Sequence, residues 1–252
     1  MWTGAAGVRV TGRYGDRTMS TTTPAVRPTT IGLPTTIGLI VALAGPFLVQ
    51  FVLAPLILQS PLHPTTAVLL GQAMLWLLAG TVIALTRWWE RKPWSWLGLR
   101  PISWPMVLLA GVLGVVLVFA VAALTAAVNR LMPPSDGGTV DSVAASAPAW
   151  LLLIVVLTAS VTEELLFRAY PIEHLARLTG KRWPGALLSL AAFVALHLQG
   201  WNLGHVVGVV LPLGAVMTGL YLWRRNLIFM IITHFFLDLP VVLLALDVLP
   251  PL

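Results

Sequence analysis

Six ionisable side chains lie inside long apolar stretches of this sequence. They are Glu163, Glu164, Arg168, His197, His234 and Asp238. An ionisable residue near the centre of a membrane helix costs at least about 2.5–3.5 kcal/mol, so each of these positions needs a structural or chemical reason. Carboxyl and imidazole groups are also the side chains that most often transfer protons in catalysis. We therefore take these residues as the candidate site.

Helical spacing assigns different roles to these residues. Positions i and i+4 share a helix face, whereas positions i and i+5 point about 140° apart. Glu164 and Arg168 can therefore form a structural ion pair. Glu163 then remains as an unpaired carboxyl that faces whatever the helices enclose. His234 and Asp238 project from one face of their helix in the same way.

The remaining histidines receive different interpretations. His197 shares a helix face with Phe193, and it can join the carboxyls only if several helices pack around one site. His205 is typical of a residue that bonds two helices together, and its role stays open. His63 and His174 fall in predicted loops, where we expect solvated roles.

The composition predicts an integral membrane protein. The chain has 252 residues, of which 58% are hydrophobic and 10% charged, whereas soluble domains have about 45–50% apolar and 25% charged residues. The low charge extends along the chain after about residue 30, so we predict one transmembrane domain over 31–252. The net charge of +6 comes from short basic clusters without a basic face, so no nucleic-acid partner is expected. The absence of cysteine excludes disulfides and a thiolate nucleophile.

Seven apolar stretches have spanning or near-spanning length for a core of about 30 Å. They are 33–59, 66–86, 105–128, 148–170, 184–199, 204–223 and 226–247. None shows the alternation of barrel strands. The sequence therefore predicts an all-α, polytopic bundle of about seven transmembrane helices, with the site enclosed by spans four, five and seven.

The basic residues predict the orientation. Clusters precede span one and follow spans two, four and six, whereas the intervening links carry little positive charge. Basic loops stay cytoplasmic, so we expect a multi-pass protein of the plasma (inner) membrane with a cytoplasmic N-terminus and the C-terminus outside. Residues 1–30 are basic and lack apolar periodicity, and they are expected to be disordered.

The expected depths of the site residues do not all agree. At 1.5 Å per residue, Glu163 and His234 lie roughly 10 and 12 Å from the cytoplasmic ends of their spans. With the same rise per residue, His197 lies roughly 20 Å from the cytoplasmic end of span five. Span five should therefore start deeper, tilt, or follow a re-entrant loop.

Three motifs follow one another within these spans. They are Glu163-Glu164-x-x-x-Arg168, Phe193-x-x-x-His197 and His234-x-x-x-Asp238, with Trp96-Leu97-Gly98-Leu99-Arg100-Pro101 upstream. Together they resemble the CPBP intramembrane proteases, the CAAX-prenyl-endopeptidase and bacteriocin-processing (Abi) group. The resemblance covers about residues 88–247, which would form the protease core.

The resemblance implies a peptidase mechanism. Glu163 with His197 would activate a water, and His234 with Asp238 would stabilise the oxyanion. Relatives from eukaryotes and archaea have Asn at the position of Asp238, whereas bacterial relatives have Asp. Because an ionised Asp cannot donate a hydrogen bond, Asp238 would be protonated or would orient His234. The implied partners are membrane lipid and a peptide or lipid-modified protein substrate.

The family was long described as metalloproteases, which leaves a metal alternative open. Glu163, His197, His234 and Asp238 would supply nitrogen and oxygen ligands for zinc. The sequence lacks the HExxH motif of zinc peptidases. We favour a metal-free glutamate mechanism without a cofactor, with zinc as the alternative.

Two other function classes compete with proteolysis. A set of membrane-embedded carboxyls and imidazoles could also relay protons in a proton-coupled transporter, but the chain shows no repeated halves of the kind found in carriers. A catalytically idle immunity or scaffold protein would have no need of all the motif carboxyls and imidazoles. An intramembrane endopeptidase remains the leading prediction.

Overall fold

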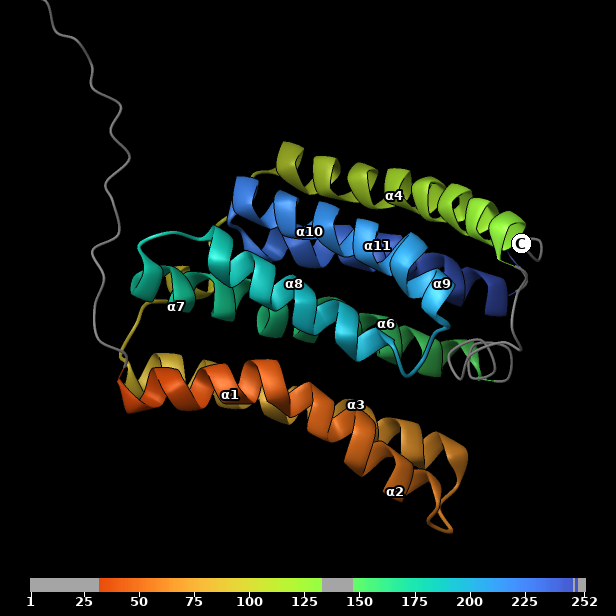
Figure 1. Cartoon of the computed structure of the whole chain (residues 1–252), viewed down its shortest axis with the longest axis horizontal. Coiled ribbons are helices and arrows are strands. Elements are labelled where there is room, and N and C mark those ends of the chain that lie inside the picture. Colours follow the sequence, from red (N-terminus) through yellow and green to blue (C-terminus); the bar gives the residue numbers. More distant parts are fainter. Residues whose placement is uncertain (1–31, 133–146, 247, 249–252) are drawn as a thin grey trace, which may run out of the picture.

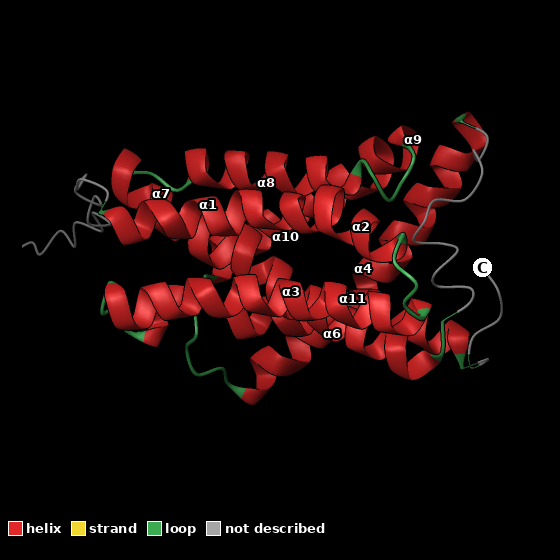
Figure 2. Cartoon of the chain, turned by 90° about the horizontal axis from the view of Figure 1, so that it is seen from below, coloured by secondary structure: helices red, strands yellow, loops and turns green. Residues whose placement is uncertain are grey.

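The computed structural model describes residues 32–132, 147–246 and 248. Every element within these ranges is a helix, and the described residues contain no strand (Figure 2). This confirms the predicted all-α fold class. The predicted disordered segment 1–30 lies outside the described residues.

The first crossing consists of α1 (Leu33–Leu48), which continues through the π-helical turn η1 (Val49–Leu53) into α2 (Ala54–Leu58). The second crossing is α3 (Pro64–Ala84) with η2 (Leu85–Trp89). A short 3-10 helix, η3 (Trp94–Leu97), then leads into α4 (Trp104–Leu131), the third crossing.

The remaining four crossings carry the candidate site. The fourth consists of α6 (Ala149–Glu164), η4 (Leu165–Ala169) and α7 (Tyr170–Thr179), and the fifth is α8 (Trp183–His197). The sixth consists of α9 (Leu203–His205), η5 (Val206–Val210) and α10 (Leu211–Arg224). The seventh is α11 (Leu227–Ala245).

The lengths of these helices fit a polytopic membrane protein. Six helical stretches in the described part of the chain are long and apolar enough to cross a bilayer, and α8 is a shorter apolar helix of 15 residues. Figure 1 shows α1 beginning at one end of the bundle and α11 ending at the other. Apolar side chains such as Leu77 and Phe119 are exposed on α3 and α4, which suits surfaces that face lipid.

Prolines explain three of the π-helical turns. Pro55, Pro171 and Pro212 each stand two residues after such a turn ends. A proline inside a helix lacks an N–H donor, and its ring clashes with the carbonyl four residues earlier. Widening the preceding turn relieves that clash without breaking the helix. One of these turns, η4, directly follows Glu164 and lies beside the candidate site.

The fourth crossing is longer than the sequence predicted, and this corrects the expected depths. The predicted span ended at residue 170, but the helix continues to Thr179 and stops where Gly180 adopts a left-handed φ of 70°. Hydropathy misses α7 because this segment is amphipathic and charged. Glu163 therefore lies roughly 24 Å from Thr179, and His197 lies roughly 21 Å from Trp183. Because a short turn at 180–182 joins α7 to α8, Glu163 and His197 lie at about the same level relative to that turn.

His174 was also assigned wrongly, for the same reason. It lies on α7 instead of in a loop, and it is buried. Its Nδ1 is 2.8 Å from the Tyr170 carbonyl oxygen, and its Nε2 is 2.9 Å from Oε2 of Glu90. Burial alone would raise the pKa of Glu90, but hydrogen bonds from His174 and Thr35 outweigh it and hold that pKa below its ordinary value.

Helix α11 packs between α4 and α6, which places the seventh crossing beside the fourth (Figure 1). Helix α11 can approach α4 closely because residue 114 is a glycine. A Cβ atom at Gly114 would lie 2.5 Å from the Thr233 carbonyl oxygen and 2.6 Å from the Cβ of Phe236. Because Thr233 precedes His234, this contact helps to fix the depth and rotation of α11 at the site.

We predict that Gly114→Ala destabilises the protein by about 1–3 kcal/mol, because the added methyl forces α4 and α11 apart. Gly80→Ala is the matched control: a Cβ at Gly80 would contact nothing within 4 Å, and alanine favours the helix by up to about 1 kcal/mol. Thermal unfolding of both purified variants in one detergent measures the difference. Equal unfolding temperatures would contradict the close packing of α4 on α11.

Candidate active site

Glu164 is the centre of the polar cluster inside the bundle. It is the last residue of α6, and its side chain is fully buried. Its Oε1 accepts hydrogen bonds from Nη1 of Arg168 at 3.1 Å and from Nδ1 of His234 at 2.8 Å. The ion pair expected from the i,i+4 spacing is therefore present. The bond to His234 is an additional link, which connects the fourth crossing to the seventh.

The hydrogen bond to Glu164 determines how His234 presents its second nitrogen. A carboxylate paired with an arginine can only accept hydrogen bonds, so Nδ1 of His234 carries a proton. Nε2 then lies 3.3 Å from Oδ2 of Asp238 and 3.9 Å from Oε2 of Glu163. Both distances are within the range of an ion pair, and the second is too long for a hydrogen bond. His234 thus directs Nδ1 at Glu164, and it directs Nε2 at the carboxyl groups of Asp238 and Glu163.

The two neighbouring glutamates have different environments. The Glu163 side chain is 21% exposed, whereas that of Glu164 is 0% exposed. Only Glu163 is therefore open to a water molecule or a substrate. Glu164 is thus ion-paired and buried, whereas Glu163 is partly exposed.

His197 lies beside this cluster without joining it directly. Its Nδ1 donates to the Phe193 carbonyl oxygen at 2.7 Å, and its Nε2 makes no hydrogen bond to a described residue. Phe193 lies between the imidazole and Arg168, with 4.4 Å between the two ring centroids and 4.1 Å from the guanidinium carbon to the ring. Within the described residues, no hydrogen bond or ion pair joins His197 to Glu163, His234 or Asp238.

Two features of the site could not be found in the sequence. Glu164 and His234 are 70 positions apart, and no periodicity links them. Phe193 was recognised only as the partner of His197 on one helix face, whereas its ring also supports Arg168. His205, whose role was left open, stacks on Trp201 with ring centroids 4.3 Å apart.

The zinc alternative can be compared with this geometry. Among the described residues, no three His, Asp or Glu side chains are grouped so that they could hold a metal ion. Glu163, His197, His234 and Asp238 therefore do not form a ligand set in this arrangement.

Comparison with known proteins identifies the part of the chain that holds this cluster. Residues 145–240 match the family model of the Rce1-like type II CAAX prenyl endopeptidases. This segment is an Rce1-like domain. The match confirms the predicted family at the level of a CPBP-type intramembrane protease, and it contains all six candidate residues.

The match covers the fourth to sixth crossings and the first part of the seventh, and it leaves the first three outside. No curated protein and no solved structure matches the chain. The apolar helices are those of a multi-pass membrane protein, and the similarity to a protease family is confined to residues 145–240.

We predict that Glu164→Ala and Arg168→Ala each destabilise the protein by about 3–5 kcal/mol, because each leaves the other charge buried without a partner. Glu163→Ala, the neighbouring control, should leave stability nearly unchanged, because Glu163 is partly exposed and forms no short hydrogen bond. Folded yield and thermal unfolding in detergent measure both effects. Equal stability of the three variants would contradict a structural role for the Glu164–Arg168 pair.

Proposed function

We propose that this protein is an intramembrane endopeptidase that hydrolyses a peptide bond in a membrane-associated or lipid-tethered substrate. The observation that carries this proposal is the orientation of His234. Its Nδ1 is held by the buried Glu164, while its Nε2 faces both Asp238 and the accessible Glu163. A fixed imidazole beside an accessible carboxylate, within an Rce1-like domain, suits the addition of water to a carbonyl group.

In the proposed reaction, Glu163 is the general base. Its carboxylate removes a proton from water while the water oxygen bonds to the substrate carbonyl carbon. Collapse of the tetrahedral intermediate breaks the C–N bond, and Glu163 returns the proton to the departing amine. His197, at the same depth, would hold the attacking water through Nε2, the nitrogen that its bond to Phe193 leaves available.

His234 and Asp238 would stabilise the oxyanion of that intermediate. A donor fixed in place before the reaction is worth more in a water-poor site than in bulk solvent. Glu164 supplies this fixation because its hydrogen bond holds the ring in one orientation. The donor would be the Nε2 proton of a charged imidazole, supported by an ionised Asp238, or the carboxyl proton of a neutral Asp238.

The arrangement of basic residues supports a cytoplasmic approach to the site. In the described part of the chain, basic side chains gather where α3, α7 and α10 end and where α4, α8 and α11 begin. Positive loops remain cytoplasmic. We therefore propose a plasma (inner) membrane location with a cytoplasmic N-terminus and the end of α11 outside. Membrane lipid and a peptide or lipid-modified protein would be the partners.

We predict that Glu163→Gln abolishes proteolysis while the protein stays folded. Profiling of new peptide termini in membranes that contain wild-type protein, Glu163→Gln or no added protein would measure this. Termini present only with the wild type would support the peptidase and reveal the substrate class. Identical termini in all three membranes, with a proton flux that depends on Glu163, would support the transporter instead.

We predict that Asp238→Asn retains activity, because an amide N–H can replace a protonated carboxyl as the oxyanion donor. The loss of activity as pH rises should also be weaker, because the amide does not ionise. Cleavage measured across pH 6–9 tests this. A fall of about 10²–10⁴-fold that a chelator does not affect would show that an ionised Asp238 orients His234. Chelator-sensitive activity of the wild type would show that a metal takes part.

A further inference from the structure

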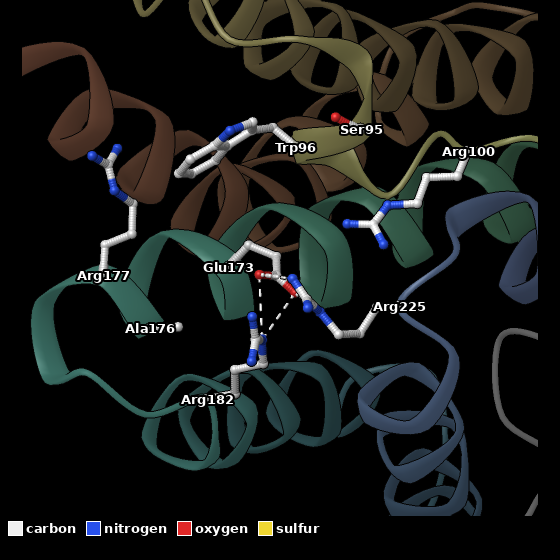
Figure 3. Close-up of a pocket in the computed structure, with 8 residues that line it drawn as sticks. All are labelled: Ser95, Trp96, Arg100, Glu173, Ala176, Arg177, Arg182 and Arg225. Carbon is white, nitrogen blue, oxygen red and sulfur yellow. Dashed lines mark hydrogen bonds and ion pairs between the residues drawn. The ribbon is translucent and has the colours of Figure 1, made fainter. Parts of the chain in front are cut away.

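A basic pocket lies at the end of the bundle where the loops of several helices meet. Its volume is about 330 Å³, and its lining includes Trp96, Arg100, Glu173, Arg177, Arg182 and Arg225. Figure 3 shows that these side chains come from η3, the loop after it, α7, the start of α8 and the link between α10 and α11. None of them belongs to the proposed catalytic cluster.

The pocket carries more positive charge than its own carboxylate can balance. Its lining contains four arginines and one glutamate. Glu173 is already shared by Arg182 at 3.3 Å and Arg225 at 2.8 Å. Arg100 has no side-chain hydrogen bond or ion pair in the described part of the chain, and Figure 3 shows no dashed line to it. An anion in the pocket would therefore meet at least one uncompensated guanidinium group.

A second uncompensated cation lies on the other side of the pocket. Arg177 packs over the Trp96 ring at 4.7 Å, and Lys92 packs over the same ring at 4.9 Å. No carboxylate among the described residues pairs with Arg177. Two cations on one indole repel each other, so a bound anion would lower the electrostatic energy of this arrangement.

The backbone around the pocket is held in an unusual conformation. Arg225 has a left-handed φ of 48°, which is uncommon for a residue with a side chain, and Gly98 has a φ of 71°. A Cβ at Gly98 would lie 3.0 Å from the Leu227 nitrogen, which itself donates to the Gly98 carbonyl at 2.8 Å. Asn226 also donates to the Arg100 carbonyl at 3.2 Å. These contacts fix the segments that carry Arg100 and Arg225 against each other.

The surroundings of the pocket indicate where its ligand comes from. Arginine forks match the oxygens of a phosphate group. Trp88 and Trp104, in the same end of the bundle, are 75% and 71% exposed, as in the aromatic belt of a membrane interface. Basic pockets between transmembrane helices at this level bind anionic headgroups. We propose that the pocket binds the phosphate of an anionic phospholipid.

A bound headgroup would connect helices that carry the candidate site. The pocket is lined by α7, which continues the helix of Glu163, by Arg182 at the start of α8, and by Arg225 just before α11. A phosphate held between them would stabilise the relative positions of these helices. The proposal does not depend on proteolysis, since binding is measured through thermal stability.

Thermal unfolding in a neutral detergent tests the proposal, with added phosphatidylglycerol or phosphatidylcholine. We expect phosphatidylglycerol to raise the unfolding temperature of the wild type by several degrees and phosphatidylcholine to have little effect. Arg100→Gln should raise about five-fold the phosphatidylglycerol concentration that gives half of the maximal stabilisation. It should leave the lipid-free protein folded, because Arg100 makes no side-chain bond to a described residue. Arg100→Lys should retain an intermediate response.

Arg130→Gln is the matched control, because it removes the same charge near the opposite end of α4. Its response should equal that of the wild type. Equal responses to the two lipids, or equal losses in Arg100→Gln and Arg130→Gln, would overturn the proposal. In a further arm, inorganic phosphate replaces the lipid at constant ionic strength. A phosphate response as large as that to phosphatidylglycerol would overturn the lipid assignment while supporting a phosphate site.

Discussion

A buried carboxylate must be compensated, and Glu164 has two partners for its Oε1, while its buried Oε2 has no hydrogen-bond partner among the described residues. Arg168 neutralises its charge from the next helical turn, and His234 donates to the same oxygen from another helix. An uncompensated charge at this depth would be strongly destabilising. The fourth and seventh crossings are therefore constrained to meet at one level. The Gly114 contact provides a second constraint, because it fixes α11 against α4 next to His234.

This constraint explains why two adjacent glutamates can have separate roles. Consecutive helical residues point about 100° apart, so anchoring Glu164 in the helix interface turns Glu163 toward a more open space. Glu164 then holds one nitrogen of His234, and the other nitrogen faces Glu163 and Asp238. In the proposed reaction the buried carboxyl of Glu164 orients the His234 imidazole, and the accessible carboxyl of Glu163 removes and returns the proton.

The sequence predicted the parts of this arrangement that depend on local spacing. The apolar stretches indicated the helices, and i,i+4 spacing indicated the Glu164–Arg168 pair. It did not predict the Glu164–His234 bond, which joins residues 70 positions apart and depends on tertiary packing. It also ended the fourth span too early, because α7 carries Glu173 and Arg177 on an amphipathic helix that hydropathy cannot distinguish from a loop. His174 was misassigned with it, since only the tertiary structure brings Glu90 to its ring.

Glu164 holds His234 by a direct hydrogen bond, and a double-mutant cycle tests this bond most directly. The unfolding free energies of wild type, Glu164→Ala, His234→Ala and the double variant would be compared in one detergent. Residues in direct contact show coupling of about 0.5–3 kcal/mol, and a bond to a buried carboxylate should give more than about 1 kcal/mol. If the losses of unfolding free energy in the two single variants sum to the loss in the double variant within about 0.3–0.5 kcal/mol, as for distant sites, the direct bond is contradicted.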